Sequence, residues 1–356
     1  MSQEFEGTMP VRDKHRFDEA RLEQYLAAHV AGFKGPLQVV QFKGGQSNPT
    51  FGLVAGSGRY VLRRKPPGKL LPSAHAVDRE YKVITALYGT GVPVAKTWCL
   101  CEDDSVIGTA FYVMDWVDGR VMWDPTVPGA TPQQRAAIFD EMNRVIAALH
   151  TVDYAKIGLA DYGKPGNYFA RQLDRWSKQY RASETQKIPA MEKLMEWLPQ
   201  HIPAGDEVAI VHGDYRLDNL MFDKEQPSIR AVLDWELSTL GHPLADFAYH
   251  CMTWHIPTGV FRGLAGVKLA ELGIPAEQDY VQRYCERTGR KGIDASDWDF
   301  YIAYNLFRLG AILQGIAGRV KEGTAASAQA GMMGAAVGPL GELGWKQVEK
   351  ILKRGS

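Results

Sequence analysis

A short polar segment in the second half of the chain combines the residue types that transfer of a phosphoryl group requires. It follows an apolar run that ends at Val211 and reads His212-Gly213-Asp214-Tyr215-Arg216-Leu217-Asp218-Asn219. Phosphoryl transfer needs a carboxylate beside the attacking hydroxyl and oxygen ligands for magnesium a short distance away. Asp214 could supply the carboxylate, and the Asn219 amide oxygen could bind the metal.

The spacing of these residues strengthens this interpretation. A histidine, an aspartate two positions later and an asparagine after four more residues form the pattern of a kinase catalytic loop. Two short apolar runs then lead to Asp234-Trp235-Glu236, where a kinase has its second metal-binding aspartate in the D-F-G motif. Alternatively, Asp214 and Asp234 are ordinary loop acids that cap turns, but the combined spacing favours the catalytic interpretation.

The first part of the chain contains candidates for binding nucleotide phosphates. The glycine-rich stretch from Lys43 to Asn48 lies between two apolar runs, so its backbone N–H groups could approach a phosphate. A plain hairpin turn fits the same pattern. Strand alternation places Arg63 and Lys65 on one face. Arg63 is the candidate cation for the phosphates, Lys65 is the alternative, and Glu80 in the next helix is the expected partner.

Hydrophobic periodicity predicts the elements that hold these residues. Strands are expected at 37–42, 50–54, 60–64, 96–102 and 110–116, with helices at 18–31 and 76–88. Beyond Trp116, short strands at 208–211, 220–222 and 229–233 interrupt helices at 133–150, 168–183, 190–198, 278–288, 296–320 and 343–353. The sequence therefore predicts an α+β fold, in which residues 1–116 form a small antiparallel-sheet lobe and residues 117–356 form a larger, mainly helical lobe.

Composition excludes several classes of protein. The chain has 356 residues, and its 41 Lys and Arg balance its 41 Asp and Glu. Proteins held by nucleic acids or anionic membranes usually carry a basic excess, so neither partner is expected. The four cysteines are too scattered for a disulfide framework. Neither a signal peptide nor an apolar run of membrane-spanning length is visible, so we expect a cytoplasmic protein.

Four groups of residues together resemble the aminoglycoside phosphotransferase family of small-molecule kinases, whose relatives include the choline kinases. They are His212-Gly213-Asp214 with Asn219, then Asp234-Trp235-Glu236, Gly241-His242-Pro243 and Asp246. The stretches 44–48, 60–73, 78–81 and 111–119 look most like the kinase domains associated with acyl-CoA dehydrogenases. This resemblance implies a bilobal, protein-kinase-like fold with ATP between the lobes.

The resemblance also implies a role for each matching residue. Asp214 would be the catalytic base or would orient the hydroxyl, and Asn219 and Asp234 would bind Mg2+. The ATP-binding residues would be Ser47 in the phosphate loop, Arg63 with Glu80 behind it, and Met114, Asp115 and Trp116 in the hinge that meets adenine.

Two positions depart from the broader kinase pattern. Arg63 stands where a lysine is usual, which keeps the charge but changes its geometry. Glu236 replaces the glycine of D-F-G and no A-P-E motif follows, which argues against a protein substrate. Two further residues on one expected helix, Asn305 and Arg308, could face the substrate or lie at an unrelated surface position.

The sequence thus favours an ATP- and Mg2+-dependent phosphotransferase acting on a hydroxyl of a small molecule, which the resemblance suggests is a hydroxyacyl-CoA. Alternatives are a nucleotide-binding pseudokinase, or a kinase for an amino alcohol, a sugar or an aminoglycoside. A polycationic aminoglycoside would favour an acidic cleft, whereas this chain has no acid excess. A metal-dependent hydrolase built on His212, Asp214, Asp234 and His242 is a further alternative, although it lacks additional histidine clusters.

Overall fold

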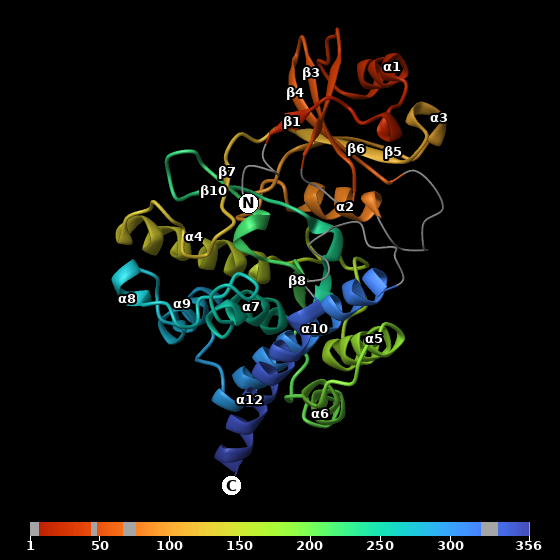
Figure 1. The fold of residues 1–356 in the computed structure, drawn as a ribbon. Coiled ribbons are helices and arrows are strands. Elements are labelled where there is room, and N and C mark those ends of the chain that lie inside the picture. Colours follow the sequence, from red (N-terminus) through yellow and green to blue (C-terminus); the bar gives the residue numbers. More distant parts are fainter. Residues whose placement is uncertain (1–6, 44–47, 67–75, 322–333, 356) are drawn as a thin grey trace. The chain divides into compact units, whose positions relative to one another are not determined.

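The computed structural model describes residues 7–43, 48–66, 76–321 and 334–355 (Figure 1). The chain forms two compact units, each assembled from separate segments. The first unit contains Met1–Val121, Ala155–Tyr162 and Asp218–Ser238. The second contains Met122–Tyr154, Gly163–Leu217 and Thr239–Ser356. The sequence division after Trp116, which separates two functional lobes, stays a prediction.

An antiparallel sheet forms the centre of the first unit. Its strands follow the order β1-β2-β3-β4-β6-β5. Their bounds are β1 (Thr8–Met9), β2 (Gln38–Phe42), β3 (Thr50–Ala55), β4 (Gly58–Arg64), β5 (Thr97–Cys101) and β6 (Phe111–Asp115). The expected strands of this sheet are all present, and the two-residue β1 is the one addition among the residues that the structure describes. The alternation of apolar and polar residues was therefore sufficient to locate this sheet.

Helices cover both faces of this sheet. On one face, Leu22 and Leu26 of α1 (Glu19–His29) share a buried cluster with Phe51, Leu53 and Leu62. Asp18 caps this helix by accepting a hydrogen bond from the Arg21 N–H. Successive strand residues point to opposite faces, so Arg63 lies on the other face, which α2 (Val77–Leu87) covers with five buried side chains. The one-turn helix α3 (Asp104–Ile107) connects β5 and β6.

A second, smaller sheet completes the first unit. The strands β9 (Leu220–Phe222) and β10 (Ile229–Val232) form a hairpin, and β9 also pairs with β7 (Arg120–Val121). The Val232 N–H donates to the Pro93 carbonyl at 2.9 Å, which ties the hairpin to the segment before β5. The hairpin therefore belongs to the same compact unit as the large sheet, although it lies far along the chain.

The second unit is mainly helical. Its helices are α4 (Pro132–Thr151), α5 (Tyr168–Ala182), α6 (Pro189–Trp197), α7 (Pro243–Cys251), α8 (Leu269–Leu272), α9 (Glu277–Thr288), α10 (Ala295–Lys321) and α12 (Val337–Gly355). The long helix α10 packs against α12, α5 and α7. One antiparallel pair accompanies the helices and consists of β8 (Ala209–Val211) and β11 (Thr239–Gly241). Short 3-10 helices lie at Asp13–His15, Leu198–Gln200, Leu217–Asn219, Trp235–Leu237 and Met252–Trp254.

Helix α7 was not expected from the sequence. All nine of its residues are buried, so it has no exposed polar face and shows no amphipathic period. It begins with Pro243, which is favoured at the first helical position. The His242 side chain caps it, because Nδ1 accepts the Leu244 N–H at 3.2 Å. A cap followed by proline was the available local signal, and periodicity alone could not reveal the helix.

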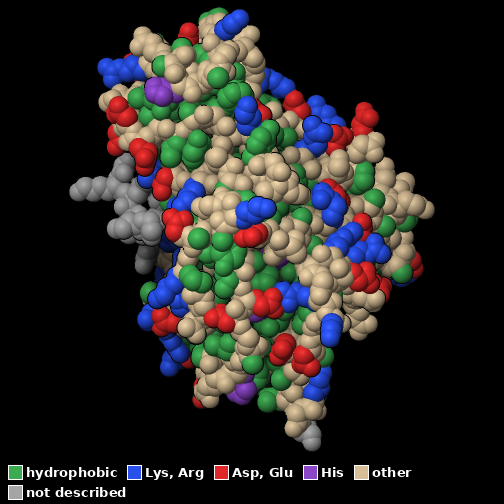
Figure 2. Space-filling model, turned by 180° about the vertical axis from the view of Figure 1, so that it is seen from behind, with side chains coloured by type: hydrophobic (Ala, Val, Ile, Leu, Met, Phe, Trp, Pro, Cys, Tyr) green, Lys and Arg blue, Asp and Glu red, His purple; other side chains and the backbone are tan. Residues whose placement is uncertain are grey.

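The surface agrees with the balanced composition. Figure 2 shows Lys and Arg side chains intermixed with Asp and Glu side chains over the face that it draws. No helix within the described ranges combines the length and apolar character needed to cross a membrane.

Candidate active site

Arg63 is the centre of a cluster of charges in the first unit. Its Nε lies 2.8 Å from Glu80 Oε2, and one of its terminal nitrogens donates to Asp234 Oδ1 at 2.6 Å. Its side chain is 11% exposed and that of Glu80 is 2% exposed. The structure thus brings together three predicted site residues from β4, α2 and the segment after β10. Lys65, the alternative cation, lies 4.0 Å from Asp78.

Further hydrogen bonds hold Glu80 in this cluster. Its Oε1 accepts from Asn48 Nδ2 at 2.8 Å, and its Oε2 accepts from the Tyr112 hydroxyl at 3.1 Å. Burial raises the pKa of Glu80, and the Arg63 guanidinium opposes this effect. Burial alone would lower the pKa of Arg63, but Glu80 and Asp234 raise it. Arg63 therefore stays charged between two carboxylates.

The two candidate metal ligands lie at the base of the β9–β10 hairpin. The Asn219 carbonyl accepts the Leu233 N–H at 2.8 Å, beside the pairing of Leu220 with Val232. Asp234 follows directly with φ 63°, a left-handed conformation that is unfavourable for residues other than glycine and is concentrated at functional sites. An amide and a carboxylate oxygen are hard donors that suit Mg2+, which keeps several waters or phosphate oxygens as its other ligands.

Asp214 lies in the second unit, where basic and hydroxyl groups hold its carboxylate. Arg216 contacts both oxygens, with Nε 2.8 Å from Oδ1 and a terminal nitrogen 3.0 Å from Oδ2. The Tyr249 hydroxyl donates to Oδ1 at 2.6 Å. The Asp214 side chain keeps 18% of its surface exposed. A carboxylate that is oriented in this way and is still partly exposed could accept a hydrogen bond from a hydroxyl group.

The buried side chain of Asp246 fixes the backbone that precedes Asp214. Its Oδ2 accepts the His212 N–H at 2.7 Å, and its Oδ1 accepts the Gly213 N–H at 2.8 Å. His150 Nε2 lies 3.2 Å from Oδ2. Burial would raise the pKa of Asp246, but the hydrogen bonds and positive potential from His150 and His212 lower it below its ordinary value. An ionised Asp246 therefore orients the candidate catalytic loop.

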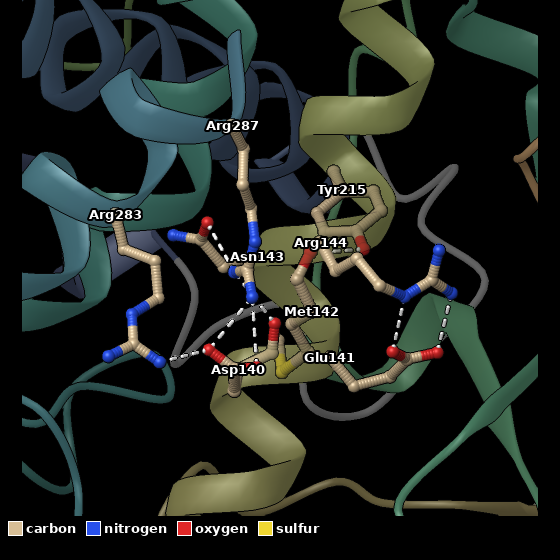
Figure 3. A network of polar contacts seen from close by, with 8 residues as sticks. All are labelled: Asp140, Glu141, Met142, Asn143, Arg144, Tyr215, Arg283 and Arg287. Atoms are coloured by element: carbon tan, nitrogen blue, oxygen red, sulfur yellow. Dashed lines mark hydrogen bonds and ion pairs between the residues drawn. The ribbon is translucent and has the colours of Figure 1, made fainter.

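The residue after Asp214 connects the loop to α4. The Tyr215 ring is fully buried, and its hydroxyl donates to the Met142 carbonyl at 2.9 Å. Figure 3 shows this contact beside a network in which Arg283 and Arg287 of α9 bind Asp140. Arg287 also donates to Asn143 Oδ1 at 2.8 Å. The candidate catalytic loop is thus attached to a pair of helices that charged hydrogen bonds hold together.

Residues of α7 and α10 contact the loop, and the sequence did not reveal them as a group. The sequence left Arg308 open between a surface position and the substrate. It is buried, and it donates to the Gly213 carbonyl at 2.6 Å. Asn305 is also buried, but its amide donates to the Ala245 carbonyl of α7 at 2.9 Å and not to the loop. Tyr249 belongs to the unexpected helix α7, and no motif pointed to it.

The remaining predicted nucleotide-binding residues lie in or beside the large sheet, except Ser47, which is outside the described residues. Met114 and Asp115 end β6, and Met114 pairs with Val61. The Asp115 N–H donates to the Lys96 carbonyl at 2.8 Å. The Trp116 ring packs on Phe42 and under the Arg59 guanidinium. A nucleotide base would therefore have to use main-chain groups other than the Asp115 N–H.

Comparisons with known proteins point to one family. The family model described as the phosphotransferase enzyme family matches residues 38–291. Acyl-CoA dehydrogenase family member 10 of Mus musculus is 45% identical over 342 residues, which cover 95% of this chain and 32% of the mouse protein. Acyl-CoA dehydrogenase family member 11 of Homo sapiens is 42% identical over 339 residues, covering 94% of this chain and 43% of the human protein. The chain thus spans less than half the length of these curated relatives.

Solved structures give the same result for the fold. A Ralstonia eutropha protein, proposed to be an aminoglycoside phosphotransferase, is 59% identical and superposes with a TM-score of 0.88 over 94% of this chain and 99% of that chain. Choline kinase from Cryptosporidium parvum is 11% identical with a TM-score of 0.65, over 95% of this chain and 97% of that chain. The expected α+β, protein-kinase-like fold and the resemblance deduced from the motifs are both confirmed.

Proposed function

The chain belongs to the phosphotransferase enzyme family, and from this premise we propose that it is a kinase that uses ATP and Mg2+ to phosphorylate a hydroxyl group of a small molecule. The observation that carries the proposal is the cluster of Arg63, Glu80 and Asp234. It combines a buried permanent cation for phosphates with a carboxylate suited to a hard metal ion.

Each residue of the cluster has a distinct part in the proposed reaction. Asn219 and Asp234 would hold Mg2+, which neutralises charge on the phosphates when it is bound. Glu80 lies against the Arg63 Nε and Asp234 binds one terminal nitrogen, and the planar fork held in this way would bind the phosphates. This arrangement is prepared before the nucleotide binds, which reduces the cost of ordering the side chain.

Asp214 would act on the acceptor. Its carboxylate would accept a hydrogen bond from the acceptor hydroxyl, orient the oxygen for attack and take up the proton as the new phosphate ester forms. Arg216 would offset charge that develops on the transferred group. We also propose that Ser47 contributes to phosphate binding and that the main chain at Met114, Asp115 and Trp116 borders the adenine ring.

We infer that the acceptor is a hydroxyacyl-CoA or a similar thioester. In the curated relatives, the matching segment is part of a longer protein named as an acyl-CoA dehydrogenase. A kinase segment joined to such an enzyme would gain from acting on the same class of acyl thioester, since linkage raises the effective concentration of a shared compound. We also infer a cytoplasmic location, because the cysteines at 99, 101, 251 and 285 are free and buried.

The test is an ATP-consumption screen over hydroxyacyl-CoAs, amino alcohols, sugars and aminoglycosides, with and without Mg2+. We expect turnover with a hydroxyacyl-CoA and a requirement for the metal. Asp214→Asn should lower kcat by about 10³-fold, because a positioned base typically contributes 10²–10⁴-fold. Binding of ATP should persist, since Asp214 is assigned to the acceptor.

A matched control is Asp223→Asn. Asp223 lies in the β9–β10 turn, where its Oδ1 accepts the N–H groups of Glu225 and Gln226, and an asparagine oxygen can do the same. Full activity of Asp214→Asn would refute the assignment. Binding of ATP without its consumption over the whole panel would favour a nucleotide-binding regulator. Turnover of an amino alcohol or an aminoglycoside alone would retain the kinase and exclude the thioester acceptor.

A further inference from the structure

Arg308 of α10 is a buried cation placed directly behind the catalytic loop. The residue is 5% exposed. One terminal nitrogen donates to the Gly213 carbonyl at 2.6 Å. Among the residues that the structure describes, no carboxylate lies within ion-pair distance of its guanidinium. Buried charges are costly unless they are paired, so a buried arginine bound to a carbonyl next to Asp214 requires an explanation other than a stabilising salt bridge.

The same guanidinium lies over two aromatic rings. Its central carbon lies 4.8 Å from the Tyr249 ring centroid and 5.6 Å from that of Trp176 in α5. Cation–aromatic contacts at these distances are attractive, and more so when water is excluded. The hydroxyl of Tyr249 in turn donates to Asp214 Oδ1 at 2.6 Å. Arg308 therefore touches both the peptide that precedes Asp214 and the tyrosine that binds its carboxylate.

Gly213 links Arg308 to the backbone of Asp214, because its carbonyl accepts the Arg308 hydrogen bond. Its φ is 82°, a conformation that glycine adopts without the steric penalty of a side chain. Its N–H is held by Asp246 at 2.8 Å, and its carbonyl is held by Arg308 at 2.6 Å. Both polar groups of Gly213 are thus fixed by buried charged side chains, one from α7 and one from α10. These two hydrogen bonds therefore fix the direction of the backbone that leads to Asp214.

We propose that Arg308 and Tyr249 are positioning residues, which together hold the Asp214 carboxylate in the orientation needed to receive the acceptor hydroxyl. Arg308 acts through the Gly213 carbonyl and through the Tyr249 ring, and Tyr249 acts through its hydrogen bond to Asp214. The inference rests on the role proposed for Asp214 above.

The ionisation of these groups supports the same arrangement. Burial and the negative charge of Asp214 raise the pKa of Tyr249, while Arg216 and Arg308 oppose this effect. Tyr249 therefore keeps its proton and acts as a donor. Burial would lower the pKa of Arg308, but Tyr304, Tyr168, Tyr249 and Asp214 raise it overall, so the guanidinium stays charged.

The kinetic test compares Tyr249→Phe, Arg308→Met, Arg308→Lys and the double variant Tyr249→Phe/Arg308→Met, using the acceptor found in the screen. We expect kcat to fall about tenfold for Tyr249→Phe and about 100-fold for Arg308→Met, with KM for ATP within about twofold, because misorientation of a reacting group affects the chemical step. Arg308→Lys keeps the charge and one donor, so it should recover part of the loss. The double variant should lose less than the product of the single losses, because both residues act on one carboxylate.

Asn305→Ala is the matched control. Asn305 is buried one turn before Arg308 on α10, and it bonds to the carbonyls of Ala245 and Tyr301 instead of the catalytic loop. It should lower the melting temperature as much as Arg308→Met does and leave kcat unchanged. If Asn305→Ala and Arg308→Met lower kcat equally, or if the single losses simply multiply, the proposed positioning role is wrong.

A second measurement is independent of turnover. Hydrogen–deuterium exchange of the peptide that contains His212 to Arg216 should accelerate in Arg308→Met and stay at the wild-type rate in Asn305→Ala. If wild-type protein consumes no ATP with any acceptor but this exchange difference is found, Arg308 does order the 212–216 backbone, while the kinase assignment fails and with it the role of Asp214 toward an acceptor. If the wild type is an active kinase and Arg308→Met changes neither kcat nor exchange, the kinase assignment stands and this inference is overturned.

Discussion

A single arginine side chain bridges two carboxylates in the candidate phosphate site. Arg63 binds Glu80 through Nε and Asp234 through a terminal nitrogen, a use of the planar fork that lysine cannot copy because its ammonium group is a point charge. Strand alternation and a helix position predicted Glu80 as a partner for a cation on β4, with Arg63 as the candidate and Lys65 as the alternative. The sequence pattern could not show that Asp234 joins them, because that contact depends on tertiary packing.

The role of this fork can be tested with Arg63→Lys. We expect KM for ATP to rise about tenfold, equivalent to about 1.4 kcal/mol of binding free energy, because lysine keeps the charge but loses one of the two directed contacts. Initial-rate kinetics with varied ATP measure the change. Arg230→Lys is the control, since Arg230 is 58% exposed and lies 4.0 Å from Asp223. An unchanged KM for ATP in Arg63→Lys would show that Arg63 does not contact the nucleotide.

At the scale of elements, the structure depends on a helix that periodicity could not reveal. Most amphipathic elements were expected within two residues of their observed bounds, because their apolar stripes face a core and their other faces meet water. The exception is α12, which begins at Val337 instead of the expected residue 343. Helix α7 is buried on all sides and has no such contrast. It nevertheless supplies Asp246 and Tyr249, which bind the catalytic loop. Asp246 was already part of the motif pattern in the sequence, whereas neither Tyr249 nor the helix that holds it was predictable.

The cap of α7 makes stability depend on pH. Burial lowers the pKa of His242 to about 4, whereas an unfolded chain should titrate at about 6.5. Between pH 6.5 and pH 4, His242 binds a proton in the unfolded state but stays neutral in the folded state. The free energy of unfolding should therefore fall over this range and then level off. One pKa unit corresponds to about 1.4 kcal/mol, so His242 should account for about 2–3 kcal/mol of this loss.

His242→Asn tests this assignment, because asparagine can still cap α7 with its side-chain oxygen. Its stability at pH 7 should be lower, since the side chain is smaller, but its urea-denaturation free energy should fall less steeply from pH 6.5 to pH 4. His250, whose burial also lowers its pKa to about 4, remains in both proteins and cancels from the comparison. Parallel pH profiles for the two proteins would contradict the assigned role.

At the scale of the whole molecule, each compact unit is assembled from segments that alternate along the chain. The first unit needs Ala155–Tyr162 and Asp218–Ser238 in addition to Met1–Val121. These segments supply the Tyr162 carbonyl that binds Arg79 at 2.7 Å and the Asp234 carboxylate that binds Arg63. A contiguous N-terminal piece is therefore an incomplete unit.

A fragment of residues 1–121 should accordingly fail to fold as the first unit does in the full chain. We expect no cooperative thermal transition by circular dichroism and no binding of ATP with Mg2+ by calorimetry, because the hairpin with Asn219 and Asp234 is missing and the surfaces that it covers are exposed. The full chain measured in the same buffer is the control. A fragment that melts cooperatively and binds the nucleotide would show that the later segments are dispensable.

The alternation of segments also limits how genes of this family can exchange parts. A single crossover between two related genes near codon 121 would take Arg63 and Glu80 from one gene and Asp234 from the other. The charged cluster of the first unit would then combine residues from two different proteins. The unit boundary between Leu217 and Asp218 divides the stretch from Asp214 to Asn219 itself. Inheritance of one unit as a block would thus require several coordinated exchanges along the gene.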